Sequence, residues 1–146
     1  MKLVLILLLS LTSAFAKNSL VGAFAEYNFD AGNIKGTMKV ELTNYNSTSN
    51  TFTQTTTTTN SQGTRNVDTE TVSADDINTQ DDNLMILSIC ETELGGSLQQ
   101  MTVAAGTFDT CKITDTDSKF YFANVPFGYV KLISTIQTVE LKSYSF

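Results

Sequence analysis

Short segments in which apolar and polar residues alternate make up most of this chain. The clearest runs from Ile34 to Leu42, where Ile34, Met38, Val40 and Leu42 face one way and the polar residues between them face the other. Alternation at period two is typical of an antiparallel strand with one face in water. Similar patterns, bounded by turn residues, predict further strands at Leu20–Phe29, Thr51–Thr59, Thr64–Val72, Leu98–Ala105, Thr107–Thr114, Phe120–Val125, Tyr129–Ser134 and Val139–Phe146.

The most apolar run after residue 16 is Leu84–Cys90, and we predict a central strand there. About nine short strands at close spacing favour an all-β fold, an antiparallel meander forming a curved sheet or open half-barrel, with a β-sandwich as the alternative. No segment shows a convincing amphipathic helix pattern. One helical turn is expected after Ser73, because Asp76 three residues later resembles a capping box. Pro126 and Gly128, the second and fourth residues of VPFG, predict a type I turn.

The N-terminus has the pattern of a secretory signal. A charged start at Lys2 precedes an apolar run and the A-x-A spacing of Ala14 and Ala16, which a signal peptidase accepts. The apolar run is too short to span a bilayer. We therefore expect residues 1–16 to be a cleaved signal peptide and residues 17–146 to form a single β domain, exported to the periplasm or secreted.

Two cysteines, Cys90 and Cys111, and no histidine occur in the sequence. An exported protein can oxidise such a pair, and the bond would stabilise the fold by about 3 kcal/mol in the chain-entropy model. Two cysteines without histidine are a poor zinc set, so we expect no metal and no cofactor. The disulfide is expected to tie two strands that turn back at Gly95 and Gly96.

The charge balance and the absence of histidine argue against several functions. With 15 Asp and Glu against 9 Lys and Arg, the net charge is −6, and the basic residues are scattered, so nucleic acid is not an expected partner. Serine–histidine and cysteine–histidine catalysis need a histidine. The carboxylate pairs lie in polar, turn-like stretches typical of solvated loops, at Asp75/Asp76, Asp81/Asp82 and Asp115/Asp117. We expect no enzymatic activity.

A threonine-rich hairpin over residues 51–72 has few apolar anchors. Threonine favours strands and is polar enough to face water. We predict that this hairpin lies at a sheet edge or projects from the body, where a polar edge resists aggregation. It is also the surface through which a structural or surface-interaction protein would contact another protein or a glycan.

Apolar residues on the inward face of the predicted sheet have two interpretations. They either line an open groove for an acyl chain or similar apolar ligand, or pack on one another as an ordinary core. The candidate residues are Phe24, Met38, Val40, Leu42, Met101, Val103 and Phe122.

The last third of the chain carries two turn motifs. Residues matching a Val-x-Ala-Gly-Thr-Phe turn and a Val-Pro-x-Gly turn are Val103, Ala105, Gly106, Thr107, Phe108, Val125, Pro126 and Gly128. On these residues the chain resembles exported bacterial proteins similar in outline to LolA-like curved β-sheets, with Phe120, Tyr121 and Phe122 in place of their Trp-containing strand. The resemblance implies a half-barrel that holds a lipid or lipoprotein acyl chain between a concave face and a lid. It supplies no catalytic residues.

These observations lead us to expect an exported, non-catalytic binding module of the cell envelope. Its partner would be an apolar ligand, a lipoprotein acyl chain or an envelope protein. The alternative is a structural or surface-interaction protein that acts through the hairpin 51–72.

Overall fold

The computed structural model describes residues 17–146, so the predicted signal peptide lies outside the described residues. Within that range the strands form one antiparallel sheet of nine strands in the order β4-β3-β2-β1-β9-β8-β7-β6-β5. The strands are β1 (Phe24–Ala31), β2 (Ile34–Asn46), β3 (Thr51–Asn60), β4 (Arg65–Ser73), β5 (Ser97–Val103), β6 (Gly106–Asp115), β7 (Ser118–Phe122), β8 (Tyr129–Ser134) and β9 (Thr138–Ser145).

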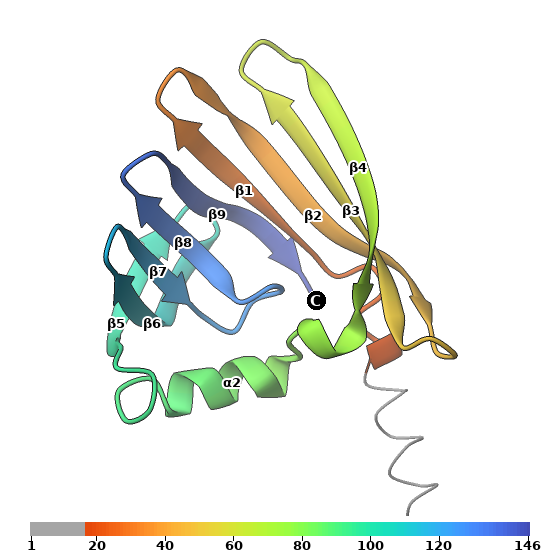
Figure 1. The fold of residues 1–146 in the computed structure, drawn as a ribbon. Coiled ribbons are helices and arrows are strands. Elements are labelled where there is room, and N and C mark those ends of the chain that lie inside the picture. The colour runs from red at the N-terminus through yellow and green to blue at the C-terminus, as the bar shows by residue number, and fades with distance from the viewer. Residues whose placement is uncertain (1–16) are drawn as a thin grey trace, which may run out of the picture.

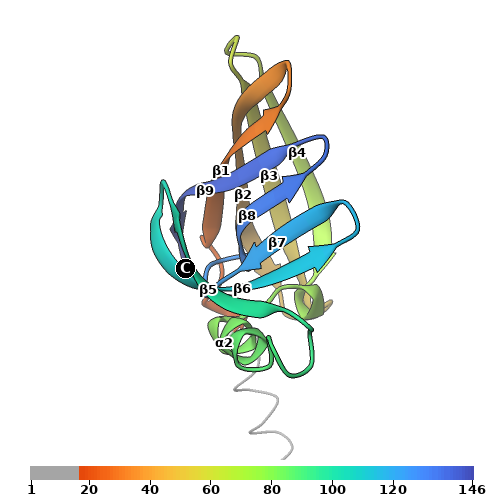
Figure 2. The ribbon, with the colours of Figure 1, turned by 90° about the vertical axis from the view of Figure 1, so that its left-hand side faces the viewer.

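The sheet is strongly curved and stays open, with β4 and β5 as its two edges (Figure 1). The prediction of an all-β antiparallel half-barrel is confirmed, and the β-sandwich alternative is wrong, because all strands of the described region belong to one sheet. Strands β5 to β9 curl in front of β1 to β4 (Figure 2). A hydrogen bond from Ala105 N to Leu141 O, 3.3 Å long, holds the β5–β6 turn against β9.

Buried side chains form two clusters inside the curve. One includes Ala25, Tyr27 and Leu141 from the central strands β1 and β9. The other contains Leu42 and Phe52 together with Leu20, which precedes β1, and Ala74, which follows β4. Phe52, completely buried, anchors the threonine-rich hairpin to the body. β4 is a sheet edge, as predicted for this hairpin.

The predicted central strand at Leu84–Cys90 is wrong, because this run lies mostly in an α-helix, α2 (Gln80–Ser88). A capping box starts the helix: Asp82 N donates to Thr79 Oγ1 at 3.2 Å, and Thr79 N donates to Asp82 Oδ2 at 2.8 Å. These reciprocal bonds satisfy amides that would otherwise lack partners at the helix start. A short apolar run does not by itself distinguish strand from helix, and here the polar cap decided.

Helix α2 connects the two edges of the sheet across its lower end (Figure 1). A 3-10 turn, η1 (Ala74–Asp76), leads from β4 to the helix. Its start is capped by Ser73 Oγ, which accepts a hydrogen bond from Asp75 N at 3.3 Å, so the helical turn expected after Ser73 is confirmed. The helix faces are unusual, since Asn83 is buried whereas Leu84 and Met85 are 51% and 57% exposed.

The disulfide between Cys90 and Cys111 is confirmed, with an S–S distance of 2.04 Å. It joins the segment after α2 to β6, so the expectation that it ties two paired strands is wrong. Gly96 lies against the bond, because a Cβ there would be 2.8 Å from both sulfur atoms. The disulfide therefore fixes the end of the helix to the sheet.

The VPFG turn has a different geometry from the one predicted. Gly128 N donates to Val125 O at 2.9 Å, which closes the turn. Phe127, the third residue, has φ of 62°, and a positive φ at this position defines a type II turn rather than type I. The type I prediction is wrong because the tertiary packing of Phe127 imposes a backbone conformation that its residue type disfavours.

Candidate functional site: an apolar cavity inside the half-barrel

A cavity of about 560 Å³ lies on the concave side of the sheet, within the roughly 300–1,000 Å³ typical of small-molecule sites. Its lining comes from strands far apart in the sheet, since β3 and β7 both contribute although four strands separate them. Only the inside of the curve brings such strands together. The lining residues are Tyr27, Phe29, Met38, Val40, Gln54, Thr58, Phe120, Phe127, Tyr129, Lys131, Leu132, Gln137 and Val139.

Strand register builds the apolar wall of the cavity. Phe29 of β1 lies opposite Val139 of β9, Val139 opposite Leu132 of β8, and Leu132 opposite Phe120 of β7. Paired residues point to the same face of a sheet, so these side chains form one continuous row across four strands. Such a row is a smooth apolar surface against which a hydrocarbon chain can lie.

The polar part of the lining comes mainly from β3. β3 supplies Gln54 and Thr58, and Gln54 Nε2 is held by Glu70 Oε1 of β4 at 2.8 Å. Thr58 lies opposite Met38 of β2. A threonine is too short to fill the space in front of the apolar row. The threonine-rich strand β3 therefore contributes to the cavity, while its neighbour β4 forms the sheet edge.

A second hollow of about 530 Å³ continues toward the lower end of the sheet. It shares Gln54, Phe127 and Tyr129 with the first cavity, and the η1–α2 connection lines its far end through Ile77 and Asn78. Two aromatic rings of its lining, Phe122 and Tyr129, pack on each other with centroids 4.8 Å apart. The two hollows together form an apolar groove with a polar lower end.

Phe127 lies at the junction of the groove. It lines both hollows and packs against both core clusters. The turn that holds it is bonded to the helix, because Asn83 Nδ2 donates to Val125 O at 2.9 Å. Strained conformations persist where the surrounding structure over-determines them, and they concentrate at functional sites. Sequence reasoning missed Phe127; the Pro-x-Gly pattern around it was the available signal.

The predicted groove residues are divided among several places. Met38 and Val40 line the cavity, and Phe122 lines the neighbouring hollow. Leu42 belongs to the second core cluster. The others do not line the groove: Val103 belongs to the first core cluster and Met101 packs against it. Phe24 lies beneath Lys39, whose Nζ is 4.5 Å from the ring centroid.

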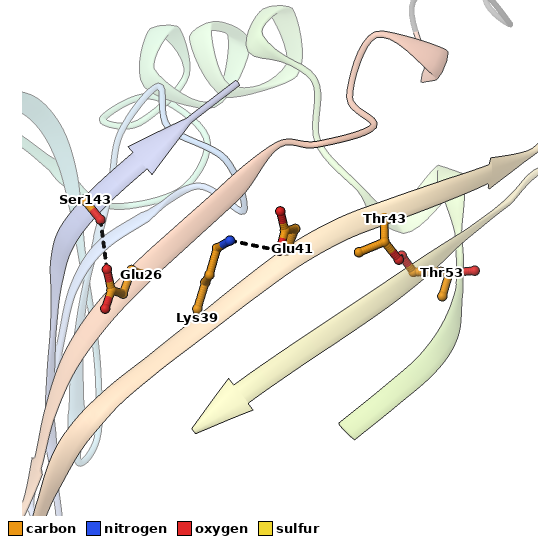
Figure 3. Close-up of polar contacts among 6 residues, drawn as sticks. All are labelled: Glu26, Lys39, Glu41, Thr43, Thr53 and Ser143. Carbon is orange, nitrogen blue, oxygen red and sulfur yellow. Dashed lines mark hydrogen bonds and ion pairs between the residues drawn. The ribbon is translucent and has the colours of Figure 1, made fainter. Parts of the chain in front are cut away.

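The outer face of β1, β2 and β9 is polar and paired (Figure 3). Glu26 accepts hydrogen bonds from Lys142 Nζ at 2.9 Å and Ser143 Oγ at 3.1 Å, and these contacts, Lys142 first, lower the pKa of its carboxyl group. Lys39 Nζ lies 2.8 Å from Glu41 Oε2. Exposed pairs of this kind contribute little stability. They keep this face solvated, so the groove remains the stronger candidate for ligand binding.

Titratable groups at the cavity are few. Lys131 is the one charged residue in the described lining, and its Nζ is paired with Glu140 Oε2 at 2.8 Å. Burial raises the pKa of the Tyr27 hydroxyl, with nearby Tyr129 adding to the effect. Across residues 17–146 no three His, Cys, Asp or Glu side chains come together in a way that would hold a metal ion. Nor does that range contain a helix with the length and apolarity needed to cross a membrane.

Comparison with models of known protein families and with curated protein sequences finds no match for this chain.

Proposed function

We propose that this protein is an exported, non-catalytic binding module that holds an apolar ligand, such as an acyl chain, inside its half-barrel. The observation that carries the proposal is the cavity, whose mostly apolar lining includes the continuous row of Phe29, Val139, Leu132 and Phe120. Binding of a hydrocarbon that displaces water from this row is favourable, because it removes apolar surface from water. The volume of the cavity suits a small ligand better than a macromolecule.

The disulfide supports a location outside the cytoplasm, because such bonds persist in oxidising compartments. The signal-like N-terminus, with Ala14 and Ala16 in A-x-A spacing, supports export to the periplasm or beyond. The LolA-like resemblance adds support for a half-barrel that carries a lipid or lipoprotein acyl chain. In this chain α2 lies across the end of the half-barrel, where a cover for such a ligand would be useful.

Filling the cavity tests the proposal. Thr58→Phe places a ring in the space opposite Met38, and we expect it to weaken binding of a fluorescent apolar probe at least tenfold by occluding the site. Thr57 is the matched control, because it is adjacent on β3 and faces the other way, opposite Lys39. Thr57→Phe should bind the probe like the wild type. Equal binding by all three proteins would contradict a site in this cavity.

Native mass spectrometry of protein purified from its own host is the complementary measurement. A bound acyl compound should appear as a mass adduct that is lost on unfolding. A strictly ligand-free protein that also fails to bind apolar probes would refute the proposal.

The second candidate function is contact with a protein or glycan through the hairpin 51–72. The observation in its favour is that β4 is an open sheet edge along which Arg65 to Thr71 are exposed. Strands at open edges can pair with a partner's strand. Because Phe52 is a core residue, deleting the hairpin would damage the fold; Val67→Lys, on the exposed edge, should abolish partner capture and leave probe binding unchanged. Unaltered capture would exclude this edge.

A further inference from the structure

Tyr27 is a buried residue with a polar group in the lining of the cavity. It lies in the middle of β1, opposite Met38 on one side and Leu141 on the other. The residue lines the cavity and is only 4% exposed. No described residue forms a hydrogen bond with its hydroxyl, and Asn124 Oδ1 is the other buried side-chain atom of residues 17–146 in this condition.

Buried hydroxyl groups are normally paired, so an unpaired one at a cavity calls for an explanation. A ligand atom is the natural partner where the ring borders a space large enough for a ligand. The hydroxyl is covered, so a neighbour has to move for the ligand to reach it. Met38 lies across the strand pair and lines the same cavity, and methionine is the most adaptable apolar side chain.

The hydroxyl defines the kind of group that would pair with it. Burial raises the pKa of Tyr27 above its ordinary value, so the phenol keeps its proton and donates a hydrogen bond. An acceptor such as a carbonyl oxygen would use this donor. A hydrocarbon without oxygen would leave the hydroxyl unpaired.

The acceptor should be neutral. Lys131, the charged residue in the lining, already has Glu140 as its partner. A free carboxylate entering this space would find no unpaired cation, and burying an unpaired charge is costly. The carbonyl of an ester or an amide accepts a hydrogen bond without that cost.

We propose that the Tyr27 hydroxyl is the polar anchor of the cavity and that the ligand is a neutral acyl ester or amide whose carbonyl oxygen accepts its hydrogen bond. The inference rests on the proposed function, since it names the ligand class of the same cavity. The apolar row from Phe29 to Phe120 holds the chain, and Tyr27 fixes the position of the carbonyl along it. Acylated molecules would thus be preferred over free fatty acids and over plain hydrocarbons.

Competition binding separates these ligand classes. Methyl dodecanoate, dodecanoic acid and dodecane are each used to displace a fluorescent apolar probe from the disulfide-intact protein at neutral pH. The wild type should bind the ester most tightly. Tyr27→Phe should lose about tenfold in affinity for the ester, the size of one net hydrogen bond, and should bind dodecane as the wild type does.

Tyr144→Phe is the matched control, because it makes the same chemical change at a ring outside the cavity lining. It should leave all three affinities unchanged. Tyr27→Phe should also unfold at the same or a higher urea concentration than the wild type, since no described partner of the hydroxyl is lost. This measurement shows that any loss of affinity does not come from a damaged fold.

The other outcomes are equally informative. Unchanged ester affinity in Tyr27→Phe, or an equal loss for all three ligands, would overturn the role of the hydroxyl as an anchor. Tighter binding of dodecanoic acid than of the ester would overturn the neutral carbonyl. If none of the three compounds binds the wild type, the proposed function itself fails, and with it this inference.

Discussion

At the scale of single residues, the groove contains two side chains in unfavourable local states. Phe127 has a left-handed backbone conformation, and the Tyr27 hydroxyl has no partner among the described residues. Each state costs free energy that the rest of the fold must offset, of the order of 1–3 kcal/mol for the backbone. Such local conflicts are expected at functional sites and are rare elsewhere.

Substituting Phe127 separates the backbone strain from the ring. We expect Phe127→Gly to be more stable than Phe127→Ala by about 1 kcal/mol, because glycine adopts positive φ without the steric penalty of a Cβ. Both variants lose the ring and should bind an apolar probe more weakly. Urea unfolding of the two variants measures the difference. A more stable alanine variant would show that the positive φ is not retained in solution.

Tyr27 should also make the protein sensitive to alkali. Its pKa in the folded state is raised by burial, whereas in the unfolded chain it titrates near its ordinary value of about 10. Above that pH the unfolded state loses a proton that the folded state keeps, so the free energy of unfolding falls as pH rises, by up to about 1.4 kcal/mol per pH unit. Below it, Tyr27 contributes no pH dependence.

Tyr27→Phe should remove this part of the alkaline slope, whereas Tyr144→Phe should retain it. The measurement is urea unfolding at a series of pH values above about 10. Identical slopes for the wild type and Tyr27→Phe would contradict the burial of this hydroxyl.

At the scale of elements, α2 is held by a polar residue and exposes apolar ones. Asn83 is buried and bonds to Val125 O, while Leu84 beside it is half exposed. The helix therefore supports the turn that carries Phe127 and the lower end of the groove. Its apolar residues contribute less to the core than their hydrophobicity predicts.

Alanine substitutions in α2 test this arrangement. Asn83→Ala leaves Val125 O without its side-chain donor and should lower the free energy of unfolding by about 1–3 kcal/mol. Leu84→Ala, at an exposed position, should change it by less than about 0.5 kcal/mol. Chemical denaturation compares the two. A larger effect at Leu84 would mean that the helix packs through its apolar face.

At the scale of the whole molecule, the disulfide stabilises the segment with α2 that connects the two edge strands, β4 and β5. Cys90 and Cys111 are 21 residues apart, and the bond joins the end of α2 to β6. Breaking it frees the helix at one end while leaving the strand pairing of β6 with β5 and β7 intact. The open sheet thus has a covalent link between β6 and the segment that connects its two edge strands.

Removing the disulfide should lower stability without changing the sheet. We expect the Cys90→Ser/Cys111→Ser variant to lose about 3 kcal/mol and to retain the circular dichroism of the β-sheet. Reductant should destabilise the wild type by a similar amount and have no effect on the variant. Equal stability with and without reductant would contradict the contribution assigned to the bond.

The sequence by itself determined the strands and the disulfide. Period-two alternation and turn residues predicted β8 at Tyr129–Ser134 and the start of β2 at Ile34, although β2 continues past Leu42 to Asn46. Two cysteines in a chain with a signal-like N-terminus leave one pairing. The strand pattern is local, so neighbouring residues contain the information needed to predict it. The disulfide pairing follows from there being only two cysteines in the sequence.

Tertiary structure decided the features that depend on distant contacts. The run Leu84–Cys90 is as apolar as a central strand, but it lies mostly in a helix that Asn83 ties to Val125 O and that the Cys90–Cys111 disulfide ties to β6. The groove gathers Met38 with Phe120 and Phe127 from across the chain, and the curvature of the sheet, which alternation does not specify, brings them together. Each side chain's face follows from local periodicity, whereas the space that the faces enclose follows only from how the whole sheet bends.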